Sequence, residues 1–312
     1  MFIIKHKWIF LTISIILVAS SLLLVFIKGI KRGIDFTGGT EVVIAYRGFT
    51  ATENGKIDLD FIKENLEKNN FEIKNISLLK IDEKGANYVL IRLPGDIKEE
   101  DRVNFENAWS FNHDPHYEAT QISENIIGPS IGKELTKKAI WSIVLVSIVI
   151  ILFVAFSFRE VSKPVSSWKY GFLTIASLLH DITIPLGMYV ILGITHGVEI
   201  DSLFVLALLT IMGISMADTI VVFDRVRENL KNRKSNETFA EVVGKSLDQT
   251  LLRSFNTSLS IILVLLALFF FGPASIHDFT LTLIVGMTFG TYSSIFIASP
   301  LLVLVEKYQK RK

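Results

Sequence analysis

The chain contains no cysteine among its 312 residues. This absence excludes disulfides, thiolate metal ligands and a cysteine nucleophile. The spacing of the remaining polar residues brings together neither a nucleophile with a base nor a set of metal ligands, so the sequence does not indicate an enzyme or a bound cofactor. The formal net charge is only +1 at pH 7, which gives no support to a nucleic-acid partner.

Charge is nearly absent from six long apolar stretches. Half of the residues are hydrophobic and the mean hydropathy is +0.46, although 20% of the residues are charged, so the charges must be segregated. Each stretch is close to the ~20 residues that a helix needs to cross a bilayer. The sequence therefore predicts a polytopic α-helical membrane protein with six transmembrane helices. The predicted spans are Trp8 to Ile27, Ala139 to Phe158, Tyr170 to Gly193, Ser202 to Phe223, Ser254 to Phe271 and Phe279 to Val305.

More than half of the charged residues lie between the first and second spans. We therefore divide the chain into 1–27, which holds the N-terminus and the first span, 28–138, which forms a soluble domain, and 139–312, which holds the other five spans. Within the last part, 224–253 mixes basic residues with apolar residues at helical spacing. This pattern predicts an amphipathic helix that lies on the membrane surface or, alternatively, against the bundle.

The soluble domain alternates predicted strands and helices in the order β-α-β-β-α-β. This order is typical of a ferredoxin-like α+β fold, which supports many unrelated functions. His113 and His116 near the last strand have no third ligand beside them, so we interpret them as surface loop residues and not as a metal site. The predicted strands are 41–47, 71–81, 87–93 and 116–124, and the predicted helices are 58–69 and 96–110.

Lysine and arginine are distributed unevenly among the short loops. The loops at 194–201 and 272–278 contain neither, whereas the N-terminus, the C-terminus and the loops between the second and third and the fourth and fifth spans are basic. Because basic loops are retained in the cytoplasm, we expect both termini to be cytoplasmic and 28–138 to be extracytoplasmic. No small-x-small cleavage site precedes Lys28, so we expect the first span to be retained.

Glycine-rich segments border the soluble domain at both ends. The first nearly matches a phosphate-binding loop, but Gly39 stands where that loop requires lysine, and a membrane span precedes it. We therefore interpret both segments as tight junctions and candidate hinges, with plain linkers as the alternative. The junction residues are Gly33, Asp35, Gly38 and Gly39 at the start of the domain and Gly128, Pro129 and Gly132 at its end.

Asp181 and Asp218 are the only carboxylates inside the six apolar stretches. A carboxylate in a membrane span is costly and usually faces a bundle interior or a water-filled cavity on an ion path. Asp218 lies six residues before Asp224, roughly 9 Å along the helix. Arg253 is its candidate partner, at the start of a polar stripe that runs through Asn256 or Thr257 to Ser260. Together they predict a proton relay, and the alternative is a static ion pair that fixes helix packing.

Asp181 shares a helix face with Thr174 and Ser177, which suggests a polar strip that faces the bundle. Asp181 is either a second relay group or a hydrogen-bond acceptor that locks helices together, and the residues alone leave both open. His180 projects about 100° away around the helix and is expected to be a packed, neutral imidazole. The motif Gly286-x-x-x-Gly290 predicts close helix contact in the sixth span.

Five motifs together resemble the SecF family, the accessory membrane subunits of the bacterial Sec protein-export translocase, and the resemblance covers essentially the whole chain. The resemblance implies half of a resistance-nodulation-division transporter in the cytoplasmic membrane, paired with SecD. It also implies that Asp218 and Arg253 take part in proton conduction. The motifs are 33–39, 128–132, 180–181, 218–225 and 249–254.

The further partners that the resemblance implies are the SecY, SecE and SecG channel, YajC, the translocating preprotein and membrane lipid. The implied activity is use of the proton-motive force to assist late steps of export. Two rival functions stay open: a structural translocase subunit that conducts nothing, and half of a small-molecule or lipid exporter of the same superfamily.

Overall fold

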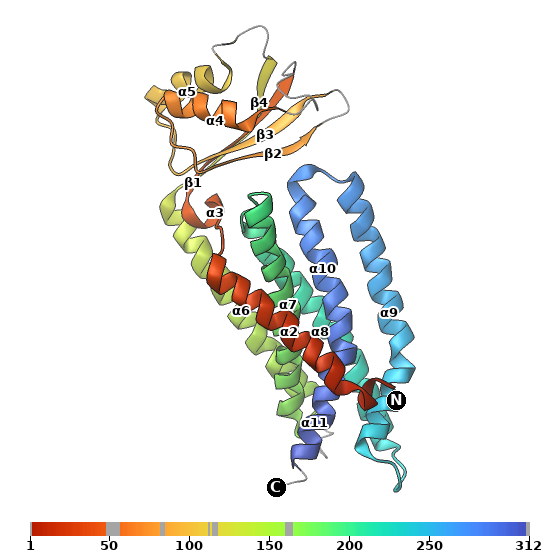
Figure 1. Cartoon of the computed structure of the whole chain (residues 1–312). Coiled ribbons are helices and arrows are strands. Elements are labelled where there is room, and N and C mark those ends of the chain that lie inside the picture. The colour runs from red at the N-terminus through yellow and green to blue at the C-terminus, as the bar shows by residue number, and fades with distance from the viewer. Residues whose placement is uncertain are drawn as a thin grey trace. The chain divides into compact units, whose positions relative to one another are not determined.

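The computed structural model describes residues 2–47, 57–81, 85–111, 113, 118–159 and 165–309 (Figure 1). Outside these ranges lie His116, the first two residues of the predicted strand 116–124, and several of the basic loop and tail residues. The chain forms two compact units. The helical unit contains Met1–Gly29, Ile140–Ile191 and Leu203–Lys312, and the domain unit contains Ile30–Ala139 together with Leu192–Ser202.

In the described part of the chain, six helices are long and apolar enough to cross a membrane, which confirms the predicted number of spans. The sixth is interrupted by a short π-helix, η3. The helices are α1 (Phe2–Lys5), α2 (Lys7–Lys28), α6 (Pro129–Ser157), α7 (Ser167–Thr195), α8 (Ser202–Lys231), α9 (Phe239–Phe271), η2 (Ala274–Ile276), α10 (His277–Ser293), η3 (Ser294–Ala298) and α11 (Ser299–Gln309).

The segment 224–253 does not form a separate helix. Helix α8 continues to Lys231, and α9 begins at Phe239 behind a capping box made by Thr238 and Glu241. The apolar residues Phe239, Val243 and Leu247 are buried in the core of the helical unit. The amphipathic pattern therefore reflects packing against the bundle and not a helix that lies on the membrane surface.

Small residues let the long helices approach closely. A Cβ atom at Gly286 in α10 would lie 2.1 Å from Ile211 Cδ1 in α8, and one at Gly290 would lie 3.1 Å from Ser215 Cβ. The predicted contact along Gly286-x-x-x-Gly290 is thus confirmed, and its partner is α8. A Cβ at Gly187 in α7 would similarly overlap Ser21 in α2.

The domain unit is a four-stranded antiparallel sheet in the order β2-β3-β1-β4, which confirms the ferredoxin-like fold. Alternate residues of the central strand β1, namely Val42, Ile44 and Tyr46, are fully buried in the core that includes both helices. The elements are α3 (Ile34–Thr37), β1 (Gly39–Arg47), α4 (Leu59–Lys68), β2 (Asn75–Ile81), β3 (Asn87–Leu93), η1 (Glu99–Asp101), α5 (Arg102–Trp109) and β4 (Glu118–Ile127).

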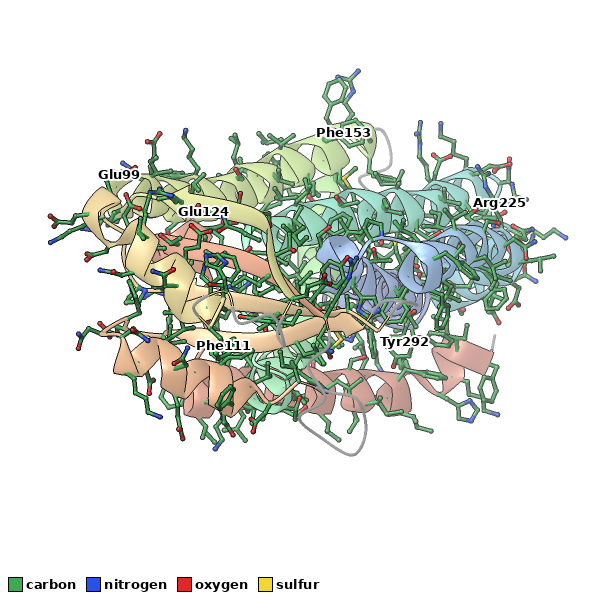
Figure 2. The ribbon with its side chains drawn as sticks, turned by 90° about the horizontal axis from the view of Figure 1, so that it is seen from above. Glu99, Phe111, Glu124, Phe153, Arg225 and Tyr292 are labelled. Carbon is green, nitrogen blue, oxygen red and sulfur yellow. The ribbon has the colours of Figure 1, made fainter. Side chains whose placement is uncertain are left out.

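Polar contacts hold α5 against the sheet. The Tyr46 hydroxyl donates to the carbonyl of Trp109 at 3.0 Å, and burial raises the pKa of Tyr46, so the hydroxyl keeps its proton. Arg102 contacts Glu124 at 3.2 Å and Glu99 at 2.9 Å, and Glu124 is the larger cause of the raised pKa of Arg102. Figure 2 labels both carboxylates.

The two glycine-rich junctions of the domain pack against each other. Gly38 and Gly39 have positive φ angles of 76° and 135°. A Cβ at Gly39 would lie 2.3 Å from the carbonyl oxygen of Leu93, and one at Gly38 would lie 2.9 Å from Pro129 Cα. A Cβ at Gly132 would in turn lie 2.9 Å from the Gly38 nitrogen. Glycine is required here by both backbone conformation and space.

Replacing Gly39 by alanine should therefore destabilise the domain by roughly 3 kcal/mol or more, since strain at positive φ adds to a steric overlap. The measurement is the thermal unfolding of the purified protein in detergent. Gly95→Ala is the matched control, because a Cβ there has nothing within 4 Å and its φ is not positive. Equal melting temperatures for the two variants would contradict this account of the junction.

Candidate functional site

Asp218 lies in the second half of α8 and is half-buried. Its Oδ2 accepts a hydrogen bond of 2.7 Å from the hydroxyl of Ser294, the first residue of the π-helix η3. A π-helical turn inserts an extra residue and so redirects the side chains beside it, and such turns are frequent at functional sites. Sequence reasoning did not single out Ser294 as a partner of Asp218, because a serine in an apolar helix does not reveal what it contacts.

A cavity of about 140 Å³ opens beside Asp218. Arg253 from α9 lines it together with Thr257, while Ser215, Gly290 and other residues of α8 and α10 form the facing walls. The volume is sufficient for several water molecules. The helices thus bring the two predicted relay residues to one cavity.

Asp218 and Arg253 do not form a direct ion pair. Within the described residues, no nitrogen of the Arg253 side chain lies within 4 Å of a carboxylate oxygen of Asp218, and Arg253 is exposed. Thr257, one of the two residues through which the predicted polar stripe runs, lines the cavity with Arg253, whereas Asn256 and Ser260 are not among the lining residues. A gap filled by water is the arrangement in which a proton can be exchanged and a guanidinium can change its distance from the acid.

Asp181 in α7 is completely buried and has three hydrogen-bonding neighbours. The hydroxyls of Ser215 in α8 and Ser293 in α10 donate to Oδ2 at 2.5 Å and 2.8 Å. His180 Nδ1 lies 3.0 Å from Oδ1. A buried carboxylate is tolerated when such donors replace the water that it has lost. Asp181 therefore joins three helices through its hydrogen bonds.

Two consecutive serines serve the two acids. Ser293 donates to Asp181, and Ser294 donates to Asp218. Consecutive side chains of a helix diverge by about 100°, so one segment of α10 and η3 can reach acids on two different helices. Ser215 and Gly290 also belong to both sites, because they line the cavity and lie next to Asp181. The two acids thus form one connected polar region.

His180 turns towards Asp181, although the sequence predicted that it projects away. Its ring is buried, stacks on Tyr292 with the ring centroids 5.9 Å apart, and leaves Nε2 without a hydrogen-bond partner in the described structure. The Tyr292 hydroxyl donates to the carbonyl of Phe10 in α2 at 3.0 Å. A path of side-chain contacts therefore runs from Asp181 to α2.

The predicted junction residues belong to the domain unit, whereas Asp181, Asp218 and Arg253 belong to the helical unit. Asp35 accepts a hydrogen bond of 2.7 Å from the backbone of Ser202, the first residue of α8. Pro129 begins α6, and the Gly132 amide donates to Gly128 in its first turn. Within the described ranges, no group of three or more histidines, cysteines, aspartates or glutamates is arranged to hold a metal ion.

Two family models match the chain. The model of the protein export membrane protein SecD/SecF, C-terminal, covers residues 108–308, and the model of the SecD/SecF GG motif covers residues 23–47. The second match contains the junction at Gly38 and Gly39, and the first contains Asp181, Asp218 and Arg253.

Individual relatives match nearly the whole chain. A protein translocase subunit SecF of Thermobaculum terrenum is 38% identical over 96% of this chain and 92% of its own length. A subunit SecF of Haemophilus influenzae is 36% identical over 92% of this chain and 80% of its own length.

A crystal structure of SecDF from Thermus thermophilus, titled a translocon-associated membrane protein, has a TM-score of 0.81 and 32% identity. The match covers 97% of this chain and 38% of that longer chain. Because sequence identity, family models and fold agree over nearly all residues, the chain belongs to the SecF family of protein translocase subunits.

Proposed function

We propose that this chain works with SecD to couple the proton-motive force to late steps of protein export across the bacterial cytoplasmic membrane. The observation that carries this proposal is the shared cavity of Asp218 and Arg253, which holds the two charges near each other without a direct ion pair. A static packing role would instead favour a closed, fully satisfied pair.

The relay works by exchange of partners at Asp218. When Asp218 is ionised, it accepts the hydrogen bond from Ser294 and attracts Arg253 through the cavity. When a proton arrives through cavity water, this attraction is lost and Arg253 moves away. Each protonation cycle therefore shifts α9 relative to α8. One charge that moves through 100 mV releases about 2.3 kcal/mol, enough to bias a two-state equilibrium by roughly fiftyfold.

Asp181 is the second relay group in this proposal. Its hydroxyl partner Ser215 also faces the cavity, so one serine separates the two acids. His180 and Tyr292 continue the contacts to Phe10 in α2, the helix that leads into the domain. Protonation is thereby coupled to α2 and, through the chain, to movement of the domain.

The basic loops support the orientation expected from the sequence, with both termini in the cytoplasm and 28–138 outside. The domain then meets preproteins as they leave the SecY, SecE and SecG channel, with YajC as an additional partner. The SecDF relative, in which SecD and SecF are fused, supports SecD as a partner of this chain.

In this movement the glycine junctions stay rigid and move together with the domain. Gly38, Gly39 and Gly132 are packed against neighbouring backbone, whereas a Cβ at Gly29 would have nothing within 4 Å. Gly29 also has a positive φ of 71° and directly follows α2. We therefore place bending at Gly29 and rigidity at the junctions.

Asp218→Asn should abolish the part of protein export that depends on the proton-motive force, because the amide cannot take up and release a proton. Assembly with SecD should be unchanged, since the side chain keeps its size and its acceptor for Ser294. The measurement is export into vesicles with and without a proton gradient. Asp224→Asn is the matched control, because this acid lies near the end of the same helix with 64% of its side chain exposed. Full gradient-dependent export by Asp218→Asn would refute the relay.

Asp181→Asn should stop proton flux through vesicles that contain SecD and this chain. The physical reason is that the acid lies one hydroxyl away from the cavity, so its loss interrupts proton exchange. Proton flux and the melting temperature are measured on the same preparation. Normal flux with a lowered melting temperature would show that Asp181 only locks α7, α8 and α10 together.

A further inference from the structure

The connection between α7 and α8 is folded into the domain unit. We name Leu192–Ser202 the α7–α8 strap. Its residue Ile200 forms a parallel β-bridge with Arg32, in which the Gly33 amide donates to Ile200 and the Ile200 amide donates to Lys31, both at 2.8 Å. The strap is thus joined to the start of the domain by backbone hydrogen bonds. In the sequence it follows the end of β4 by more than 50 residues.

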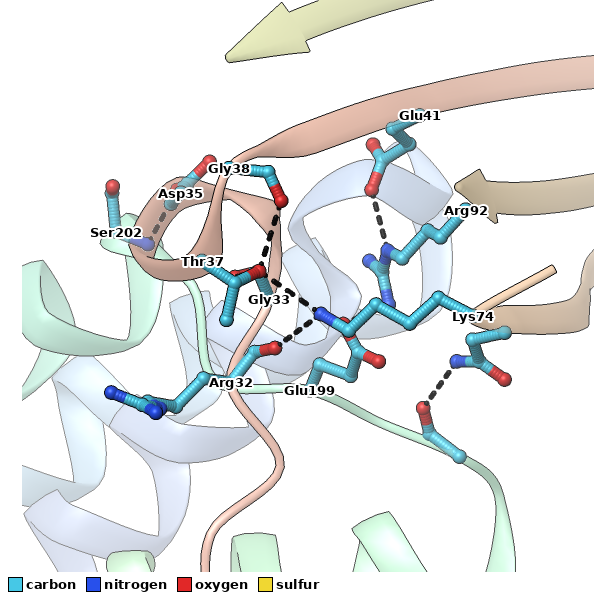
Figure 3. A network of polar contacts seen from close by, with 12 residues as sticks. Arg32, Gly33, Asp35, Thr37, Gly38, Glu41, Lys74, Arg92, Glu199 and Ser202 are labelled. Carbon is cyan, nitrogen blue, oxygen red and sulfur yellow. Dashed lines mark hydrogen bonds and ion pairs between the residues drawn. The ribbon is translucent and has the colours of Figure 1, made fainter. Parts of the chain in front are cut away.

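A buried carboxylate fastens the strap. The side chain of Glu199 is only 5% exposed, and its Oε2 lies 3.5 Å from Lys74 Nζ and 3.4 Å from Arg92 Nη1 (Figure 3). Arg92 also pairs with Glu41 at 2.7 Å. Lys74 donates to the carbonyl of Arg32 at 2.7 Å. A buried charge that loses its partners is strongly unfavourable, so this network opposes separation of the strap from the sheet.

Contacts on both sides of Glu199 complete the attachment. Asn75 Nδ2 donates to the carbonyl of Gly197 at 2.9 Å, and Lys31 Nζ donates to Gly193 at 2.7 Å. At the other end, Asp35 accepts from the Ser202 amide at 2.7 Å (Figure 3). A carboxylate at the first turn of α8 is favoured by the partial positive charge of a helix N-terminus. The strap is therefore held along its whole length.

We propose that the α7–α8 strap is a permanent mechanical joint, and that α7 and α8 move the domain directly. These are the two helices that carry Asp181 and Asp218, so a displacement caused by protonation has a short route to the domain. Glu199 is the positioning residue of this joint. The inference rests on the proposed proton coupling. It adds a second route from the acids to the domain, through the α7–α8 hairpin, to the route through α2.

Glu199→Ala in the full chain, assembled with SecD in vesicles, should separate the two activities. Proton flux should persist, because Glu199 is not part of the cavity, whereas gradient-dependent export should fall to the level measured without a gradient. Glu100→Ala is the control, since this acid of the same domain has 77% of its side chain exposed. Undiminished export by Glu199→Ala would overturn the proposal.

An engineered disulfide between the strap and the domain provides a second test of the proposal. Arg32→Cys with Ile200→Cys places the only two thiols of the chain on opposite residues of the β-bridge, a spacing that suits a disulfide. Oxidation in the Glu199→Ala background should restore export, and reduction should remove it again. Each single-cysteine variant should show no response to oxidation.

The same disulfide in the otherwise native chain should leave export unchanged, because a permanent joint need not open. This experiment in the native background tests the proposal even if Glu199→Ala does not fold. Loss of export on oxidation would show that the strap must detach, which overturns the proposal. Failure of the proton relay can be told apart from failure of the strap proposal. If the relay is wrong, Asp218→Asn shows normal gradient-dependent export, whether or not the strap is attached to the domain.

Discussion

A carboxylate inside a helix bundle is tolerated only if the protein supplies the hydrogen bonds that water supplies elsewhere, and this constraint organises the helical unit. Asp181 receives hydroxyl donors from α8 and α10, so both helices must approach α7 closely. The glycines at 286 and 290 make this approach possible, because larger side chains would hold α10 away from α8. The spacing of α7, α8 and α10 is therefore set by the hydrogen bonds to the buried acids as much as by apolar packing.

The two acids have different surroundings, which suit them to different tasks. Asp181 is enclosed, with two hydroxyls that donate to Oδ2 and with His180 Nδ1 3.0 Å from Oδ1. Asp218 has Ser294 on one side and a cavity on the other. In the proposed relay, the enclosed carboxylate exchanges a proton through Ser215, whereas the carboxylate beside the cavity exchanges its partners directly. Since Ser293 and Ser294 are consecutive, a shift of this segment changes both environments together.

The sequence predicted the features that depend on local composition and periodicity. The six spans, the order of strands and helices, and the choice of Asp218 and Arg253 as candidate partners follow from apolar runs, alternation and the rarity of charge inside spans. Hydroxyl partners were not predictable, because Ser293 and Ser294 gain their roles only from the helices packed beside them. Glu199 was missed for the same reason. Its partner Lys74 is 125 residues away, and the loop around Glu199 was informative only for its lack of lysine and arginine.

The α7–α8 strap also sets an order for biogenesis. The ribosome releases Lys74 and Arg92 well before Glu199, and α6 and α7 are synthesised in between. During that interval Arg92 has Glu41 but not Glu199 beside it, and Arg32 lacks its β-bridge to Ile200. The domain therefore gains its last contacts only after the third of the long apolar helices has been synthesised.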